Sequence, residues 1–236
     1  MKTTFNSPLK FMAMLMIALT TVFSFSACSD DEDAATPAAA AAGKLMIIHA
    51  SPDAPAVDLL LDGTKLNSSA VNYTDNTAYI SAAAGTRVLK VNVAGTSTTA
   101  LQASLSVVSG KNYSVFAIDS VSNLSGLVVE DNLAAPAAGK AHVRFIHLSP
   151  NAPAVDVAVD GGAIVFGDYI FKEASDFTPL DAGTYDLEVR VAGTPNVALD
   201  LDPITLTAGK IYTVYAKGFL GGVVPQELGA QIIVNN

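Results

Sequence analysis

The sequence alternates between apolar and polar positions with a period of two, the pattern of a β-strand with one buried face. In the segment VDVAVDG, Val155, Val157 and Val159 fall on one side of the chain and the intervening residues on the other. An Asp-Gly pair follows at Asp160–Gly161, and its counterpart stands at Asp62–Gly63. Because Asp-Gly is typical of tight hairpin turns, both positions predict a strand that reverses direction.

Segments of the same kind recur at intervals of about eight to twelve residues, with glycine-containing turns between them. They include VLKVNVAG, ASLSVVSG, YSVFAID, YDLEVRVAG and IYTVYAKG. Helical periodicity is weak throughout the chain. We therefore expect an all-β protein with about seven short strands in each copy of an Ig-like β-sandwich.

A long internal repeat divides the chain. HASPDAPAVDLLLDG, residues 49–63, returns as HLSPNAPAVDVAVDG, residues 147–161, and later landmarks such as VAGT and GKNYSVFA/GKIYTVYA keep nearly the same spacing. Each copy has about 95 residues, a common domain size. We expect two tandem β-sandwich domains, residues 44–135 and 136–236, joined by the small-residue stretch AAPAAG without a long linker.

The amino-terminal segment has a different composition. Lys2 and Lys10 precede the apolar run FMAMLMIALTTVFSF, which at about fifteen residues is shorter than the roughly twenty that cross a bilayer as a helix. This pattern predicts a secretory signal peptide over residues 1–27. Residues 28–43 are acidic and then rich in Ala, Thr and Pro. Such a composition cannot build a core, so we expect a flexible tether.

Cys28 is the only cysteine and directly follows the signal. The stretch FSAC resembles the lipobox of bacterial lipoproteins, with Phe25 where Leu is usual. The resemblance implies that Cys28 is acylated and becomes the amino terminus; an ordinary signal peptide followed by a free thiol is the alternative. Because each buried methylene contributes about 0.8 kcal/mol, several acyl chains hold a protein stably on a membrane.

The acidic run SDDED follows Cys28. It resembles the export signal that directs lipoproteins of Bacteroidota-type bacteria to the outer face of the outer membrane. We therefore expect a protein anchored to the cell outer membrane by its lipid and facing the exterior. A plain acidic spacer is the alternative interpretation.

The charge balance argues against one class of partner. The formal net charge is −9, and loss of residues 1–27 removes Lys2 and Lys10 but no acidic residue, which makes it −11. Binding of nucleic acid depends on clustered Lys and Arg that neutralise phosphates, and the sequence has no such cluster. We expect no nucleic-acid partner and no cofactor.

The repeated HxSPxAPAVD motif has a structural interpretation. The two prolines of SPDAP fix two φ angles and make it a stiff connection between strands. Asp53 suits a turn, and its counterpart Asn151 lacks the charge. Chemistry that needed this carboxylate could therefore not be equivalent in both copies.

The histidines His49 and His147 end the preceding strand in each copy. The alternation in AHVRFIH places His147 on the face of Val143, so we expect partly buried rings that hydrogen-bond to loop backbone or to a nearby Asp or Ser. Asp58 and Asp156 point away from the valine face and are expected to reach the SPxAP loop or solvent.

A catalytic interpretation uses the same motif, which contains the residue types of a hydrolytic triad twice. The candidate motif positions are His49, Ser51 and Asp58, and in the second copy His147, Ser149 and Asp156. The chain has no G-x-S-x-G elbow and no evident oxyanion loop. We therefore expect no enzymatic activity and assign no catalytic residue, with a secreted hydrolase as the alternative. One His and one or two Asp per copy fall short of a usual zinc ligand set, and EF-hand spacing is absent, so we expect no metal site.

Recognition is the third interpretation, because the loops of such domains are the usual place for binding. Aromatic residues cluster where the two copies diverge most: Tyr73, Tyr79, Phe166, Tyr169, Phe171 and Phe177. They either offer a platform for a glycan or protein or fill the core. The tripeptide Asp119-Ser120-Val121 resembles an O-glycosylation sequon of the same bacteria, which makes Ser120 a candidate modification site.

Together, the HASPDAPAVD stretch, the DG turn, the AGT segment and the GKxYT/SV segment resemble the bacterial family catalogued as domain of unknown function 4397, over both repeats. The resemblance implies an extracytoplasmic β-rich domain, often in tandem on surface proteins, with no established activity. We expect a lipid-anchored cell-envelope protein that acts as a non-catalytic binding, adhesion or structural module. Its expected ligand is a glycan or an envelope protein.

Overall fold

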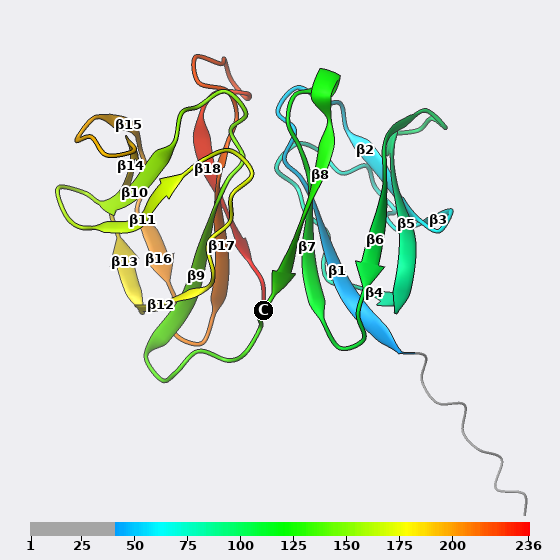
Figure 1. The fold of residues 1–236 in the computed structure, drawn as a ribbon, viewed down its shortest axis with the longest axis horizontal. Coiled ribbons are helices and arrows are strands. Elements are labelled where there is room, and N and C mark those ends of the chain that lie inside the picture. Colours follow the sequence, from blue (N-terminus) through cyan, green and yellow to red (C-terminus); the bar gives the residue numbers. More distant parts are fainter. Residues whose placement is uncertain (1–40) are drawn as a thin grey trace, which may run out of the picture. The chain divides into compact units, whose positions relative to one another are not determined.

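The computed structural model describes residues 41–236, which lie in one compact unit. The expected signal peptide, Cys28 and nearly all of the expected tether lie outside the described residues. The described chain consists of strands, turns and one short 3-10 helix, η1 (Val121–Asn123). The predicted class, all-β with two tandem β-sandwich domains, is confirmed (Figure 1). Within residues 41–236 no helix has the length and hydrophobicity needed to cross a membrane.

The first sandwich consists of two four-stranded sheets. One has the order β4-β1-β7-β8, with strands β4 (Ile80–Ala83), β1 (Ala42–His49), β7 (Asn112–Ile118) and β8 (Ser125–Asp131). The other has the order β3-β2-β5-β6, with strands β3 (Thr64–Lys65), β2 (Val57–Leu61), β5 (Gly85–Val93) and β6 (Thr99–Val107).

The second sandwich repeats this plan with one difference. One sheet has the order β12-β9-β17-β18, with strands β12 (Thr178–Asp181), β9 (Lys140–His147), β17 (Ile211–Lys217) and β18 (Gly229–Val234). The other has the order β11-β10-β14-β15, with strands β11 (Ile164–Tyr169), β10 (Val155–Val159), β14 (Leu187–Val191) and β15 (Val197–Asp200). A separate pair, β13 (Gly183–Tyr185) and β16 (Ile204–Leu206), completes the domain. The long β5–β6 ladder of the first repeat is thus divided in the second.

The local signals in the sequence account for the strand ends. Asp62 and Gly63 have φ angles of 48° and 84°, as a two-residue hairpin between β2 and β3 requires. Strand β1 begins at Ala42, two residues before the expected start of the first domain at residue 44. A Cβ at Gly43 would lie 2.7 Å from the Cγ1 atom of Val107, so this start of the strand needs glycine.

The alternation of VDVAVDG predicted one buried face for β10, but both faces are buried. Val155 and Val157 belong to the core of the second sandwich. On the opposite face, Asp156 is 3% exposed and Ala158 is fully buried. On this face the backbone N–H of Asp168, in β11, donates to the Asp156 carboxylate at 2.7 Å.

Each sandwich has its own core, and a third apolar cluster joins the two repeats. Strands β1, β7, β9 and β17 send alternate side chains into their own core and the others into this shared cluster. Its buried members are Met46, Ile48, Ala50, Phe116 and Ile118 from the first repeat and Ile146, Leu148, Tyr215 and Ile233 from the second. Phe116 and Tyr215 occupy equivalent positions and meet edge to face, with ring centroids 5.8 Å apart.

A buried ion pair lies at this interface between the repeats. Arg144, in β9, reaches Asp131, in β8, with an N–O distance of 2.6 Å, and their side chains are 1% and 0% exposed. The guanidinium also donates to Ser114 of the first repeat at 2.9 Å and to Thr213 of the second at 2.8 Å. Burial of so polar a group is tolerated only with this degree of pairing.

Two further residues close the hydrogen-bond network into a ring. Tyr79 donates to the Asp131 carboxylate at 2.5 Å and accepts from the Asn235 amide at 3.2 Å, and Thr213 donates to the oxygen of that amide at 2.7 Å. Burial, and then the charge of Asp131, raise the pKa of Tyr79. The phenol therefore keeps its proton as the donor to Asp131.

Candidate functional site

The repeated histidines make the same hydrogen bond in both repeats. The Nε2 atom of His49 lies 3.0 Å from the carbonyl oxygen of Pro55, and that of His147 lies 3.0 Å from the carbonyl oxygen of Pro153. Because a carbonyl only accepts, Nε2 carries the proton in each ring. The side chains are 2% and 0% exposed. Both rings bond to loop backbone, one of the predicted partners, and they are fully buried where partial burial was expected.

The serines tie the same loop to the turn after β7 or β17. Ser51 donates to the carbonyl oxygen of Asp119 and Ser149 to that of Gly218, each at 2.6 Å. Both acceptor residues have positive φ angles, 76° and 77°. This backbone conformation aims the carbonyl at the serine in both copies.

The turn position of the motif makes a second equivalent contact. The carboxylate of Asp53 accepts from the N–H of Val121 at 2.7 Å, and the amide oxygen of Asn151 accepts from the N–H of Leu220 at 2.7 Å. An uncharged amide oxygen thus accepts the same backbone hydrogen bond in one copy that a carboxylate accepts in the other. This equivalence supports the structural interpretation of the position.

The aspartates of the motif serve another turn. Asp58 accepts from the N–H of Gly95 at 3.0 Å and Asp156 from that of Gly193 at 2.9 Å, which fastens the VAGT turn to the start of β2 or β10. Neither carboxylate hydrogen-bonds to the SPxAP loop, and both residues are largely buried, so this expectation was wrong. Lys65, followed by the Gly95 N–H, lowers the pKa of Asp58.

The structure therefore places His, Ser and Asp of the motif near one another without joining them. In neither copy does a hydrogen bond run from His to Ser or from His to Asp, and the Nδ1 atoms of both rings have no partner among the described residues. A triad needs a base bonded to its nucleophile and to an orienting carboxylate. The polar atoms of the motif instead hold two turns against the strands.

Burial lowers the pKa of both His49 and His147, against the opposing effect of their backbone hydrogen bonds. The folded protein therefore binds a proton at these rings less readily than the unfolded chain does. Stability from the neutral rings is fully present above the ordinary histidine pKa of about 6.5 and is lost as pH falls from there through the lowered pKa of the folded state.

We expect the His49→Gln/His147→Gln double variant to lose less stability between about pH 7.5 and pH 5 than the unchanged protein does. Gln keeps a donor for the proline carbonyl but does not titrate. Urea unfolding at the two pH values measures the difference, and His142→Gln, which replaces the remaining histidine, is the matched control. If the free energy of unfolding falls by the same amount between the two pH values in the double variant and in the unchanged protein, this account is contradicted.

The other sequence candidates have structural surroundings of their own. Ser120 is half-buried before η1, with its hydroxyl 3.1 Å from that of Ser122. Phe166 lies in the core of the second sandwich, and Tyr79 and Phe171 pack against the shared cluster. No group of three or more His, Cys, Asp or Glu side chains that could hold a metal ion occurs in residues 41–236.

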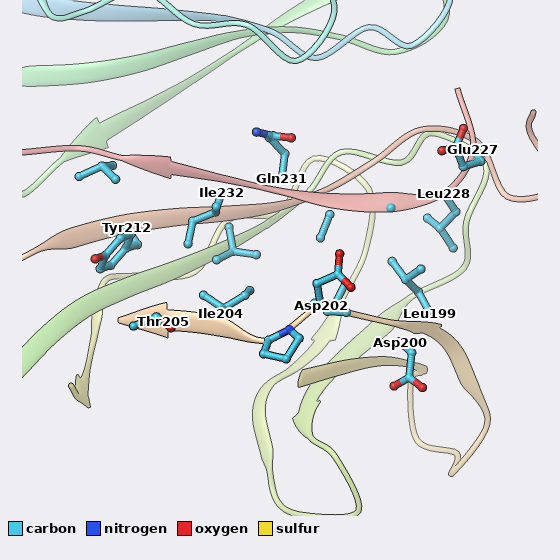
Figure 2. Close-up of a pocket in the computed structure, with 16 residues that line it drawn as sticks. Leu199, Asp200, Asp202, Ile204, Thr205, Tyr212, Glu227, Leu228, Gln231 and Ile232 are labelled. Carbon is cyan, nitrogen blue, oxygen red and sulfur yellow. The ribbon is translucent and has the colours of Figure 1, made fainter. Parts of the chain in front are cut away.

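A groove that the sequence analysis did not find opens in the second sandwich. It lies between β18, the edge of one sheet, and the β15–β16 edge facing it, and has a volume of about 660 Å³. Its apolar lining includes Leu199, Leu201, Ile204, Tyr212, Val214, Ala230, Ile232 and Val234. Figure 2 shows Ile232 and Leu199 pointing into the groove from opposite edges and the Asp202 carboxylate directed toward β18.

The same place in the first sandwich is nearly filled. Leu101, Leu105, Val115, Gly126 and Val128 occupy the equivalent positions there and line a cavity of only about 140 Å³. The two repeats share the turns and the motif, but at this place the second repeat has a groove large enough for a ligand and the first does not.

One inserted residue accounts for the difference. Between VAGT and the following Gly-Lys pair, the second repeat has one residue more than the first and carries Asp202-Pro203. Proline cannot donate to a strand ladder, so the single strand β6 corresponds to two separate strands, β15 and β16. A comparison of the two copies by length reveals this insertion in the sequence.

Comparisons with known proteins address the family. A search among curated proteins gave no match. The family model described as a domain of unknown function, DUF4397, matches residues 43–158 and again residues 153–236. The two matches together span most of the chain and both sandwiches, so the protein belongs to the DUF4397 family as a tandem of two such domains.

Proposed function

We propose that this protein is a lipid-anchored cell-envelope protein that faces the exterior and acts as a non-catalytic binding module, with the groove of the second sandwich as its ligand site. The observation that carries the proposal is a difference in volume: the groove of the second sandwich has about 660 Å³, and the cavity at the equivalent place in the first has about 140 Å³. The FSAC and SDDED stretches support the anchor and the outward orientation.

The groove is a better ligand site than the repeated motif. In both copies the motif engages its hydroxyl, ring N–H and carboxylate with backbone groups. Such groups have little capacity left for a ligand. The groove instead exposes apolar side chains, with Ile232 36% and Val234 47% exposed, and burial of apolar surface is the main source of binding free energy.

We expect Ile232→Arg to weaken ligand binding by at least about tenfold, because the long arginine side chain would occupy the groove in place of the ligand. The full chain in detergent is assayed for saturable binding of purified envelope polysaccharides and of solubilised outer-membrane proteins. Val128→Arg is the matched control, since Val128 holds the equivalent place in β8 and is 44% exposed. Binding that survives Ile232→Arg unchanged would exclude the groove as the ligand site.

We expect Cys28→Ala to release the protein from the membrane fraction, because loss of the acyl chains removes about 0.8 kcal/mol per buried methylene. Immunoblotting of soluble and membrane fractions measures the distribution. Ser29→Ala, one residue further on, is the control for a change that leaves the cysteine in place. Membrane association that persists in Cys28→Ala would refute acylation as the sole attachment.

A further inference from the structure

We propose that the groove binds an extended segment of a partner protein that adds as a strand to β18, with apolar side chains at alternate positions and basic residues beside them. This inference rests on the proposed function, since it names the chemistry of the ligand for the same groove. It derives from the unpaired edge of β18, the apolar side chains that line the groove and the acidic residues among that lining.

The first step is the open edge. Within residues 41–236, strand β18 pairs with β17 alone, and the N–H of Asn235 donates to the carbonyl of Ile211 on that side. Because bonded and non-bonded pairs alternate in an antiparallel ladder, the N–H and C=O groups of Ala230, Ile232 and Val234 point away from β17. An added strand would pair with these three residues.

The second step is the floor of the groove. The side chains of Ala230, Ile232 and Val234 lie on the groove side of β18, and Leu199 and Ile204 face them from β15 and β16. An added strand places every second side chain on this side. Those side chains would fill the space that Pro203 opened, as the continuous β6 fills it in the first repeat.

The third step is charge. Among the described residues, the groove lining includes Asp200, Asp202 and Glu227 and no Lys or Arg. The Asp202 carboxylate points toward β18, whereas those of Asp200 and Glu227 point away from the groove (Figure 2). Electrostatic complementarity therefore favours a basic segment. The chain's own SDDED run and a second copy of this chain, with a net charge of −9, are both disfavoured.

The length of β18 sets the size of the probe. Strand β18 has six residues, which corresponds to about 20 Å of extended chain. A fluorescein-labelled peptide with alternating Val and Thr, flanked by two Lys at each end, meets the three requirements. One control peptide carries Glu in place of Lys, and another has N-methyl groups on the amides that would face β18.

Fluorescence anisotropy with the full chain in detergent tests the inference. We expect the Lys-flanked peptide to bind saturably, the Glu-flanked peptide to bind at least about fivefold more weakly, and the N-methylated peptide at least about tenfold more weakly. Ile232→Pro removes an N–H that β17 does not use and should also weaken binding at least about tenfold. Val128→Pro, at the equivalent edge position of β8, should leave binding unchanged.

Hydrogen exchange supplies a readout that does not depend on a variant. Binding of the Lys-flanked peptide should slow exchange of the Ile232 and Val234 amides, because strand addition gives them acceptors. If the N-methylated peptide binds as tightly as its parent, strand addition is wrong although the groove still binds ligand. If no peptide binds but Ile232→Arg abolishes binding of an envelope component, the peptide inference alone is overturned. A dimer in sedimentation that Ile232→Pro dissociates would also overturn it, in favour of a second copy.

Discussion

Replacement of Arg144 by Met is expected to destabilise the protein by about 3 to 5 kcal/mol, the largest loss we anticipate from the interface between the repeats. The change leaves the Asp131 carboxylate buried without its cationic partner and also removes donors to Ser114 and Thr213. Urea unfolding of the full chain in detergent measures the loss.

The protein itself offers the matched control. Met46 occupies the position of Arg144 in the first repeat, and Asn235 occupies that of Asp131 in the second. The double variant Arg144→Met/Asp131→Asn therefore installs residues that equivalent strands already accommodate, and removes both charges together. We expect it to recover most of the loss, since burial of an ion pair yields little net stability over neutral groups. Equal losses in the single and double variants would show that the pairing of the charges contributes nothing.

This network also marks the limit of what alternation can predict. The pattern in AHVRFIH correctly separates Val143 and Phe145 from Arg144 and Ile146. It does not say that the second face is buried against another domain, because period two identifies which residues share a face and not what covers that face. The apolar residues of LMIIH, on both sides of β1, are the local sign that neither face meets water.

The motif was more predictable than the groove. The placement of His49 and the turn role of Asp53 followed from strand ends and proline geometry, which are local properties. The partners of Asp58 were not predictable, because Gly95 comes near only when β2 and β5 pair. The groove depends on a single insertion at Pro203, whose effect arises only where the edges of two sheets meet.

Replacement of Gly218 by Ala is the second substitution with a large expected effect, about 3 to 5 kcal/mol. Gly218 has a φ of 77°, and a Cβ there would collide with the carbonyl oxygen of Glu227 and lie 2.5 Å from its carbonyl carbon. The side chain cannot fit unless the backbone before β18 moves. Thermal or urea unfolding of the full chain measures the cost.

The control variant, Gly209→Ala, distinguishes the cost of the positive φ angle from the cost of the steric clash with Glu227. Gly209 has a φ of 81°, and a Cβ there would meet no other atom within 4 Å. Gly209→Ala should therefore lower the free energy of unfolding only by the strain of the left-handed conformation, about 1 to 2 kcal/mol. If the two variants unfold alike, the close approach of Glu227 to Gly218 is not a feature of the folded protein.

The same collision bears on function. Gly218 accepts the hydrogen bond of Ser149, so the repeated motif holds the turn from which the chain runs through Glu227 into β18. A backbone displaced at Glu227 shifts one wall of the groove, and ligand binding should weaken in Gly218→Ala but not in Gly209→Ala. In this protein the turn geometry that the two copies share supports a groove that is large in the second copy alone at this place.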